Sequence, residues 1–147
     1  MLKNLIVCIC AVALSAAKAE ATESWQILFN NKVIFKGNSD QNDPSASLKV
    51  SAFKATDKIT ITYSMSNADN TWKRTFLIND ESEKNFVTLE LNKQSGSVCF
   101  NAAKLKDLLE KKKPFYIHTV SVPKNPSLAA SVRVRRVLLC KVEWNKL

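Results

Sequence analysis

The sequence predicts a mainly β fold: an antiparallel β-sandwich of about seven to eight strands with one short helix. Short runs of alternating apolar and polar residues recur along the chain, which is the pattern of half-buried strands. Turn-forming residues separate these runs at close intervals. Helical periodicity replaces the alternation once, over about residues 101–112. These observations favour a sandwich over an open barrel.

The first residues have the form of a secretory signal peptide. Lys3 precedes an apolar run, Leu5–Leu14, and Ala17–Ala19 has the A-x-A form of a cleavage site. We therefore predict cleavage after Ala19 and a periplasmic or secreted mature protein. The apolar run is shorter than the about 20 residues of a spanning helix, so we expect no membrane span after cleavage.

Removal of residues 1–19 leaves residues 20–147 as one predicted β-sandwich domain, long enough to bury its own core. Two lysines and no acidic residue are lost, so the formal net charge falls from +9 to +7. A basic exported domain is attracted to anionic head groups, polysaccharides and proteins. The alternative is that the charge only maintains solubility. Export makes nucleic acid an unexpected partner.

Alternating residues before and after Asn30-Asn31 predict the first hairpin. Asparagine tolerates positive φ, so this pair suits a two-residue turn. We expect the second strand to place Val33 and Phe35 on its buried face. Further strands are predicted over residues 47–53, 58–65, 71–78, 85–91 and 115–122, and Arg74 falls on the apolar face of its strand.

The single predicted helix carries a stripe formed by Leu105, Leu108 and Leu109. We expect the Asn101 side chain to cap its first turn. Three lysines, Lys111–Lys113, follow at the end where the helix dipole favours cations. We expect this helix to cover one end or one edge of the sandwich.

The stretch SVRVRRVLLCKVEW (Ser131–Trp144) predicts the last strand. A regular register turns Arg133, Arg135 and Lys141 outward, and these are the candidate anion contacts. The alternative is a solvated face with cross-strand pairs to acidic residues. The same register places Arg136 on the core face, where it needs a carboxylate or carbonyl partner. A bulge near Arg136 is the less favoured alternative.

Trp72 follows a turn and is the candidate for stacking on a sugar ring, with a core position as the alternative. Cys99 and Cys140 remain after processing, and export permits a disulfide between them. The equally weighted alternative is that Cys140 is a free, buried thiol in an apolar strand.

No catalytic, metal or cofactor site is predicted. His118 is the single histidine, and no Gly-x-Ser-x-Gly elbow, metal-ligand spacing or phosphate-binding glycine pattern occurs. A small hydrolase that uses His118 is the remaining enzymatic alternative. We therefore expect an exported, non-enzymatic module that binds another protein or an envelope component. The alternative is a binding module for an anionic or sugar polymer.

The signal peptide, Trp72-Lys73-Arg74 and the block VPKNPSLAASVRVRRVLLC (Val122–Cys140) resemble small exported proteins of uncharacterised function from Gram-negative bacteria of the Bacteroidetes type. This resemblance implies a periplasmic or secreted β-rich domain. It implies no catalytic residue.

Overall fold

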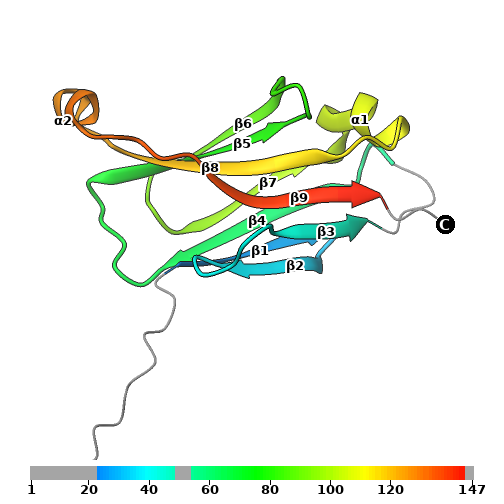
Figure 1. The fold of residues 1–147 in the computed structure, drawn as a ribbon, viewed down its shortest axis with the longest axis horizontal. Coiled ribbons are helices and arrows are strands. Elements are labelled where there is room, and N and C mark those ends of the chain that lie inside the picture. The colour runs from blue at the N-terminus through cyan, green and yellow to red at the C-terminus, as the bar shows by residue number, and fades with distance from the viewer. Residues whose placement is uncertain (1–22, 49–53, 145–147) are drawn as a thin grey trace, which may run out of the picture.

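Strands in two facing sheets make up most of the computed structural model, which describes residues 23–48 and 54–144 (Figure 1). Sheet A has the order β2-β1-β4-β7, with bounds β1 Glu23–Phe29, β2 Lys32–Asn38, β4 Lys58–Met65 and β7 Gly96–Asn101. Sheet B has the order β3-β9-β8-β5-β6, with bounds β3 Ser45–Leu48, β5 Trp72–Asn79, β6 Asn85–Leu91, β8 Phe115–Pro123 and β9 Val137–Trp144. The pairing is antiparallel except between β3 and β9. The predicted β-sandwich is thus confirmed.

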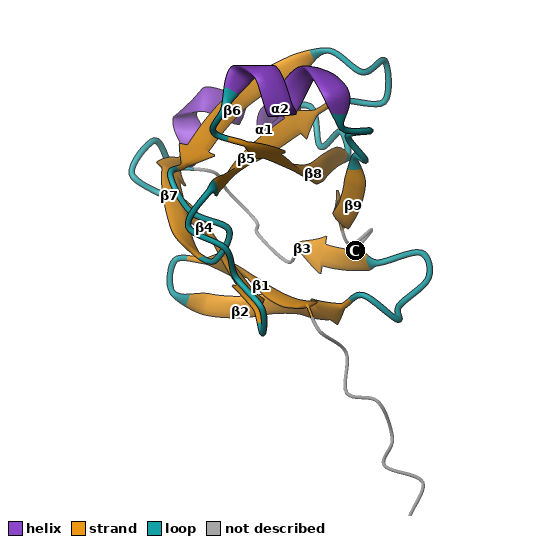
Figure 2. Ribbon diagram, turned by 90° about the vertical axis from the view of Figure 1, so that its left-hand side faces the viewer, coloured by secondary structure: helices purple, strands orange, loops and turns teal. Residues whose placement is uncertain are grey.

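The inner faces of the two sheets enclose one hydrophobic core. Its largest fully buried side chains come from both sheets and from the helical segment after β7: Tyr63, Phe76, Phe115, Ile27, Leu48, Ile59, Ile61, Ile78, Leu105, Ile117, Leu139 and Val142. β3 lies close to β2, and β6 lies close to β7, so the sheets approach each other at both edges (Figure 2). Removal of these apolar surfaces from water stabilises the fold.

The first hairpin turns at Asn30-Asn31 as predicted, with φ angles of 48° and 65°. A bulge at Ile34 interrupts the pairing of β1 with β2. The bulge shifts the strand by one residue relative to its neighbour. Phe35 is therefore buried as expected, but Val33 is 39% exposed, so its predicted burial is wrong.

The predicted helix over residues 101–112 begins as a 3-10 helix, Ala102–Leu105, and continues as α1, Lys106–Glu110. Its leucine stripe is buried as expected. The Asn101 side chain makes no capping hydrogen bond, so that prediction is wrong. The N–H of Ala102 donates to the Asp57 carbonyl at 2.7 Å, so the first N–H group of the helix is bonded to the segment before β4.

The predicted strand Ser131–Trp144 is wrong over its first six residues, 131–136. Helix α2, Pro126–Ser131, occupies its start, and residues 132–136 are irregular before β9 begins. The Asn125 Oδ1 atom accepts hydrogen bonds from the N–H groups of Ser127 and Leu128, and Pro126 supplies a helical φ at the first position. These local signals stop β8 and start a helix.

The regular register predicted for the last strand is also wrong. Leu139 has no partner on β8, because Leu138 and Cys140 pair with successive residues there. This bulge buries Leu139 and Cys140 side by side. The Leu139 carbonyl accepts a hydrogen bond at 2.9 Å from Nε1 of Trp25, which lies in the opposite sheet. The bulge therefore provides a polar link between the two sheets.

The structure differs from the predicted strands at two further places, β3 and β7. β3 starts at Ser45, inside a predicted loop, and residues 49–53 of the strand predicted there lie outside the described residues. β7 was not predicted at all. The predicted signal peptide, residues 1–19, likewise lies outside the described residues. Within the described part, no helix has both the length and the hydrophobicity required to cross a membrane.

Candidate functional site

One segment projects from an end of the sandwich and carries exposed apolar side chains together with exposed arginines. This segment, which we name the arm, runs from Lys124 through α2 to Arg136. Figure 1 shows it in orange at the left, beyond the end of β8. The N–H of Lys124 donates to the Thr71 carbonyl at 2.8 Å, so the arm begins next to the start of β5. None of the α2 side chains is buried.

Two large apolar side chains of the arm are exposed to water. Leu128 is 46% exposed and Val134 is 44% exposed. Among the described residues, the third large hydrophobic side chain exposed to a similar extent is Val33, near the start of β2. Two of the three thus lie within seven positions of one short segment. Exposed apolar groups concentrated in this way are typical of interaction surfaces.

Arg133 and Arg135 are exposed and lie in the irregular part of the arm. No ion pair among the described residues includes either of them. Lys141 lies six positions beyond Arg135, which is about 20 Å along an extended chain. Its ammonium pairs with Glu143 at 2.5 Å, and this contact raises the pKa of Lys141. The three predicted anion contacts therefore do not form one patch.

Trp72 opens β5 and pairs with Pro123, directly before the arm. Its side chain lies on the inner face of sheet B at the end of the sandwich and is half-buried. The structure therefore places the predicted stacking residue beside the base of the arm.

The two cysteines are separate free thiols. Cys99 is exposed on the outer face of sheet A, whereas Cys140 is fully buried on the inner face of sheet B. Burial raises the pKa of the Cys140 thiol to about 12. The structure has no disulfide between Cys99 and Cys140. It agrees with the other alternative, in which Cys140 is a free, buried thiol.

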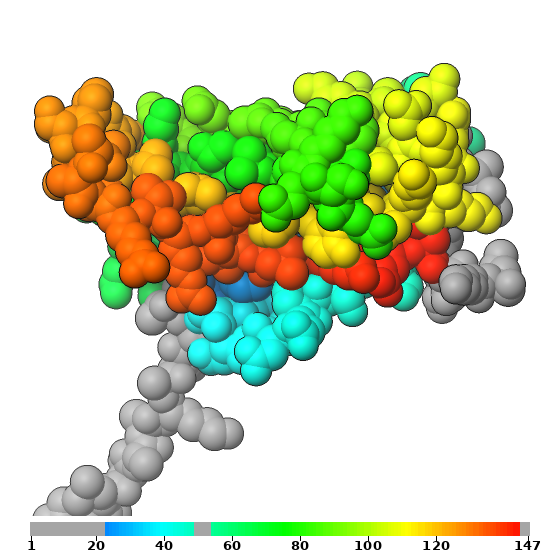
Figure 3. Space-filling view, turned by 45° about the horizontal axis from the view of Figure 1, so that its top comes forward, coloured from blue at the N-terminus to red at the C-terminus, as the bar shows by residue number. Residues whose placement is uncertain are grey.

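A cavity of about 260 Å³ opens on the outer face of sheet B. Its lining comes from the turn after β5, from β8 and from the start of β9: Asp80, Glu81, Glu83, Tyr116, His118, Arg136 and Leu138. Figure 3 shows the turn, in green, standing over the yellow and orange strands beneath it. The sequence pattern did not predict this cavity, because its acidic residues looked like an ordinary solvated turn.

Arg136 lies at the base of the arm and forms one wall of this cavity. Its predicted position on the core face is wrong, whereas the expected carbonyl partner is present as the side-chain oxygen of Asn79. Arg136 is exposed, and its Nη2 atom lies 3.3 Å from Asn79 Oδ1 and 3.0 Å from His118 Nδ1. Because β9 begins only at Val137, the direction of the Arg136 side chain is not set by strand pairing. The side chain extends over β8 to Asn79 on β5.

His118 is neutral in this environment. Burial, and to a smaller extent the adjacent Arg136 guanidinium, together lower its pKa to about 4. Since the guanidinium can only donate, Nδ1 accepts and the ring proton lies on Nε2. The His118 and Tyr116 rings stack with an interplanar angle of 20°. His118 can therefore donate one hydrogen bond and offer a flat ring surface.

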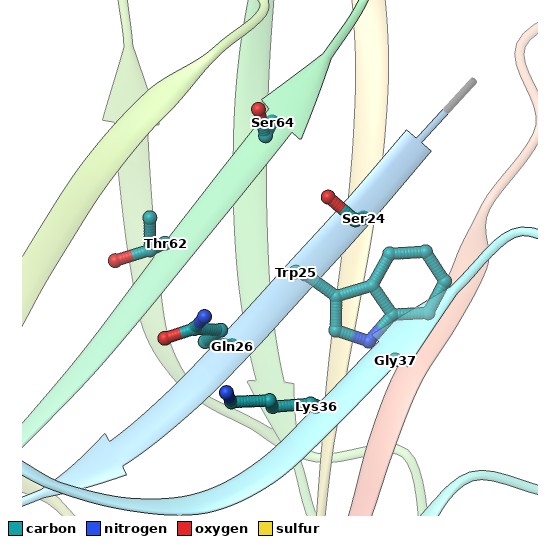
Figure 4. Close-up of a pocket in the computed structure, with 7 residues that line it drawn as sticks. All are labelled: Ser24, Trp25, Gln26, Lys36, Gly37, Thr62 and Ser64. Atoms are coloured by element: carbon teal, nitrogen blue, oxygen red, sulfur yellow. The ribbon is translucent and has the colours of Figure 1, made fainter. Parts of the chain in front are cut away.

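A second hollow, of about 220 Å³, lies over sheet A. Its lining residues come from β1, β2 and β4: Ser24, Trp25, Gln26, Lys36, Gly37, Thr62 and Ser64 (Figure 4). Gly37 lies against the Trp25 indole, and a Cβ atom there would come within 2.6 Å of Nε1. The indole N–H donates to the Leu139 carbonyl and is therefore not available to a ligand. The polar groups left in this hollow are the hydroxyl and amide side chains and the Lys36 ammonium.

Among the described residues, no three His, Cys, Asp or Glu side chains are grouped as metal ligands. Comparison of the chain with protein-family models gave no match, and neither did comparison with curated proteins. The functional interpretation therefore rests on the arm and the two hollows.

Proposed function

We propose that the protein is an exported, non-enzymatic interaction module that docks on a partner protein or another envelope component through the arm. The observation that carries this proposal is the composition of the arm. Leu128 and Val134 are exposed beside two arginines that have no ionic partner among the described residues. A partner that covers these side chains buries apolar surface and forms charge-assisted hydrogen bonds with the arginines.

Export is part of the proposal and rests on the leader, residues 1–19. The periplasm or the external medium is the expected location. Expression of the full-length chain in a Gram-negative host, followed by mass spectrometry of the extracellular and periplasmic fractions, tests this part. A mature N-terminus at Glu20 is expected, and an uncleaved chain in the cytoplasm would contradict it.

The proposal that the module is not an enzyme is supported by the surroundings of His118. Its Nδ1 atom faces the Arg136 guanidinium rather than a carboxylate. A catalytic triad instead orients its histidine with a carboxylate on the ring nitrogen that does not face the nucleophile, and here an arginine occupies that place. The hydrolase alternative predicts that His118→Ala abolishes an esterase or glycosidase activity of the purified protein.

A second candidate function is binding of an anionic or sugar polymer. The observation that favours it is the exposure of Arg133 and Arg135 two positions apart. Binding of a polyanion through such groups weakens steeply with salt because counterions are released on binding. Docking that depends on Leu128 and Val134 is less sensitive to salt.

A pull-down from native envelope extract with the mature chain, residues 20–147, at low and high salt tests the proposal. A defined component retained at high salt supports docking through the apolar arm residues. Polymer or lipid that elutes with salt supports the second candidate. Recovery of no component at either salt concentration would contradict both.

A further inference from the structure

The cavity on the outer face of sheet B presents opposite charges that do not contact each other. Asp80, Glu81 and Glu83 lie on one side, and Arg136 lies on the other. No ion pair between described residues joins Arg136 to any of these carboxylates. A flexible arginine beside three acids on an open surface would ordinarily be free to approach them. In this structure a network of hydrogen bonds holds it at a distance.

Asn79 is the centre of that network and is 5% exposed. Its Nδ2 group donates to the Glu83 carbonyl at 3.2 Å, and its Oδ1 atom accepts from Arg136. One buried amide therefore holds both the acidic turn and the guanidinium. His118 accepts a second hydrogen bond from the same Nη2 atom. The remaining guanidinium nitrogens have no described hydrogen-bond partner and are available to a ligand.

The turn itself is fixed by its own side chain. Asp80 Oδ1 accepts hydrogen bonds from the N–H groups of Ser82 and Lys84, at 2.8 and 3.0 Å. This leaves Glu81 and Glu83 as exposed carboxylates at the rim of the cavity. The turn is therefore an ordered acidic wall, with the stacked Tyr116 and His118 rings as the floor.

We propose that this cavity binds a small dipolar molecule, one that carries an ammonium group and an anionic group in the manner of an amino acid. The ammonium pairs with the acidic turn, the anionic group pairs with Arg136, and the carbon chain between them lies along the His118 ring, since the Lys141 ammonium lies 5.6 Å from the centre of the Tyr116 ring. A volume of about 260 Å³ accommodates a molecule of this size. The cavity shares Arg136 with the base of the arm, but none of its other lining residues belongs to the arm, and Leu128 and Val134 take no part in it.

The charge separation of the ligand is the unknown quantity, so the test uses a series of ω-amino acids. Glycine, 4-aminobutanoate and 6-aminohexanoate carry the same two groups at increasing distances. Each is titrated into the ¹⁵N-labelled mature chain, and amide shifts are followed by NMR. Butylamine and butyrate serve as singly charged controls. We expect saturable shifts from at least one amino acid, centred on residues 79–84, 116–118 and 136–138.

Variants show which groups carry the binding. Arg136→Gln and Glu83→Gln should each weaken binding of the active amino acid at least about tenfold, because one charge partner is lost. Lys32→Gln and Glu90→Gln each remove one charge outside the cavity and should leave the affinity unchanged. Circular dichroism establishes that each variant is folded.

Three outcomes would overturn the proposal. The first is the absence of saturable shifts from every amino acid at about 10 mM. The second is that butylamine or butyrate binds as tightly as the amino acids, because one charge would then suffice. The third is that Lys32→Gln weakens binding as much as Arg136→Gln does.

Discussion

Arg74 shows how this fold tolerates a cation in its interior. It is 3% exposed, and no carboxylate among the described residues forms an ion pair with it. Its Nε and Nη1 atoms donate to the Gln94 carbonyl and to Thr119 Oγ1, at 2.8 and 3.1 Å. Its guanidinium lies 3.8 Å from the centre of the Tyr63 ring, in the opposite sheet. Hydrogen bonds and a desolvated cation–π contact thus replace the missing carboxylate.

Substitution of Arg74 is expected to destabilise the sandwich. Arg74→Ala should lower the free energy of unfolding by about 2–4 kcal/mol, because it leaves a cavity and an unpaired buried carbonyl. Arg74→Met should cost less, since it fills most of the volume. Urea unfolding of the mature chain measures both, with the exposed Arg133→Ala as the matched control. Equal stability of Arg74→Ala and the control would show that the buried guanidinium makes no contribution.

His118 is expected to make stability depend on pH in mildly acidic solution. The folded chain protonates this ring at about pH 4, whereas the ordinary value of 6.5 applies after unfolding. Between these values the unfolded state binds more protons, so stability falls as the pH drops from 6.5 to about 4. His118→Gln should make the curve flatter in this interval. Urea unfolding across it measures the slope, and identical slopes for the two proteins would contradict the assignment.

Among the elements, the β1–β2 turn and the arm show two different uses of asparagine. In the turn, Asn30 Nδ2 donates to Asp57 Oδ1 at 2.8 Å, and Asn30 Oδ1 accepts from the Lys58 N–H at 2.9 Å. The hairpin is thereby tied to the start of β4. In the arm, Asn125 caps α2 with no buried side chain to support the helix. The first asparagine supports the whole sandwich, and the second supports only a local element.

Substitutions in the turn should separate these contributions. Asn30→Ala should lower the free energy of unfolding by about 1–3 kcal/mol, because Asp57 and the Lys58 N–H lose their partner. Asn31→Gly should change it by less than about 1 kcal/mol, since glycine adopts the observed φ of 65° readily. Both are measured by urea unfolding. A larger loss for Asn31→Gly than for Asn30→Ala would contradict the role given to the Asn30 side chain.

Removal of the cap should unfold α2 alone. A six-residue helix is marginal in water, and the cap contributes about 1 kcal/mol. In Asn125→Ala, amide hydrogens of α2 should therefore exchange faster, while global stability in urea changes by less than about 0.5 kcal/mol. NMR-detected hydrogen exchange makes the measurement. Unchanged exchange in α2 would show that other contacts hold the arm.

For the whole molecule, the sequence pattern predicted the sandwich because burial on one face of each strand produces regular alternation. It predicted eight strands and missed β7, where Cys99 and its neighbours alternate over only six residues before the helix. It also extended the last strand through the arm, although Asn125-Pro126 is a helix-start signal. The three bulges, in the β1–β2, β5–β6 and β8–β9 pairs, were not predictable, because each depends on pairing with another strand.

The candidate site was predicted less completely than the fold. Arg133 and Arg135 were correctly expected at the surface, but they lie on an arm rather than on a strand face. Arg136, Asn79 and the acidic turn meet only through tertiary structure, so no spacing in the sequence indicated their cavity. Arg74 was correctly expected on the apolar face of its strand, whereas the same expectation for Arg136 was wrong, because β9 begins only after that residue.

The pull-down with paired variants of the arm tests the central claim most directly. Leu128→Ser with Val134→Ser removes the apolar groups, and Arg133→Gln with Arg135→Gln removes the cations. Lys32→Gln with Lys36→Gln, on β2, is the control for loss of charge. The account predicts that both arm variants lose the envelope component recovered by the wild-type chain, and that the β2 variant retains it. Equal recovery by all four proteins would show that the arm is not the docking surface.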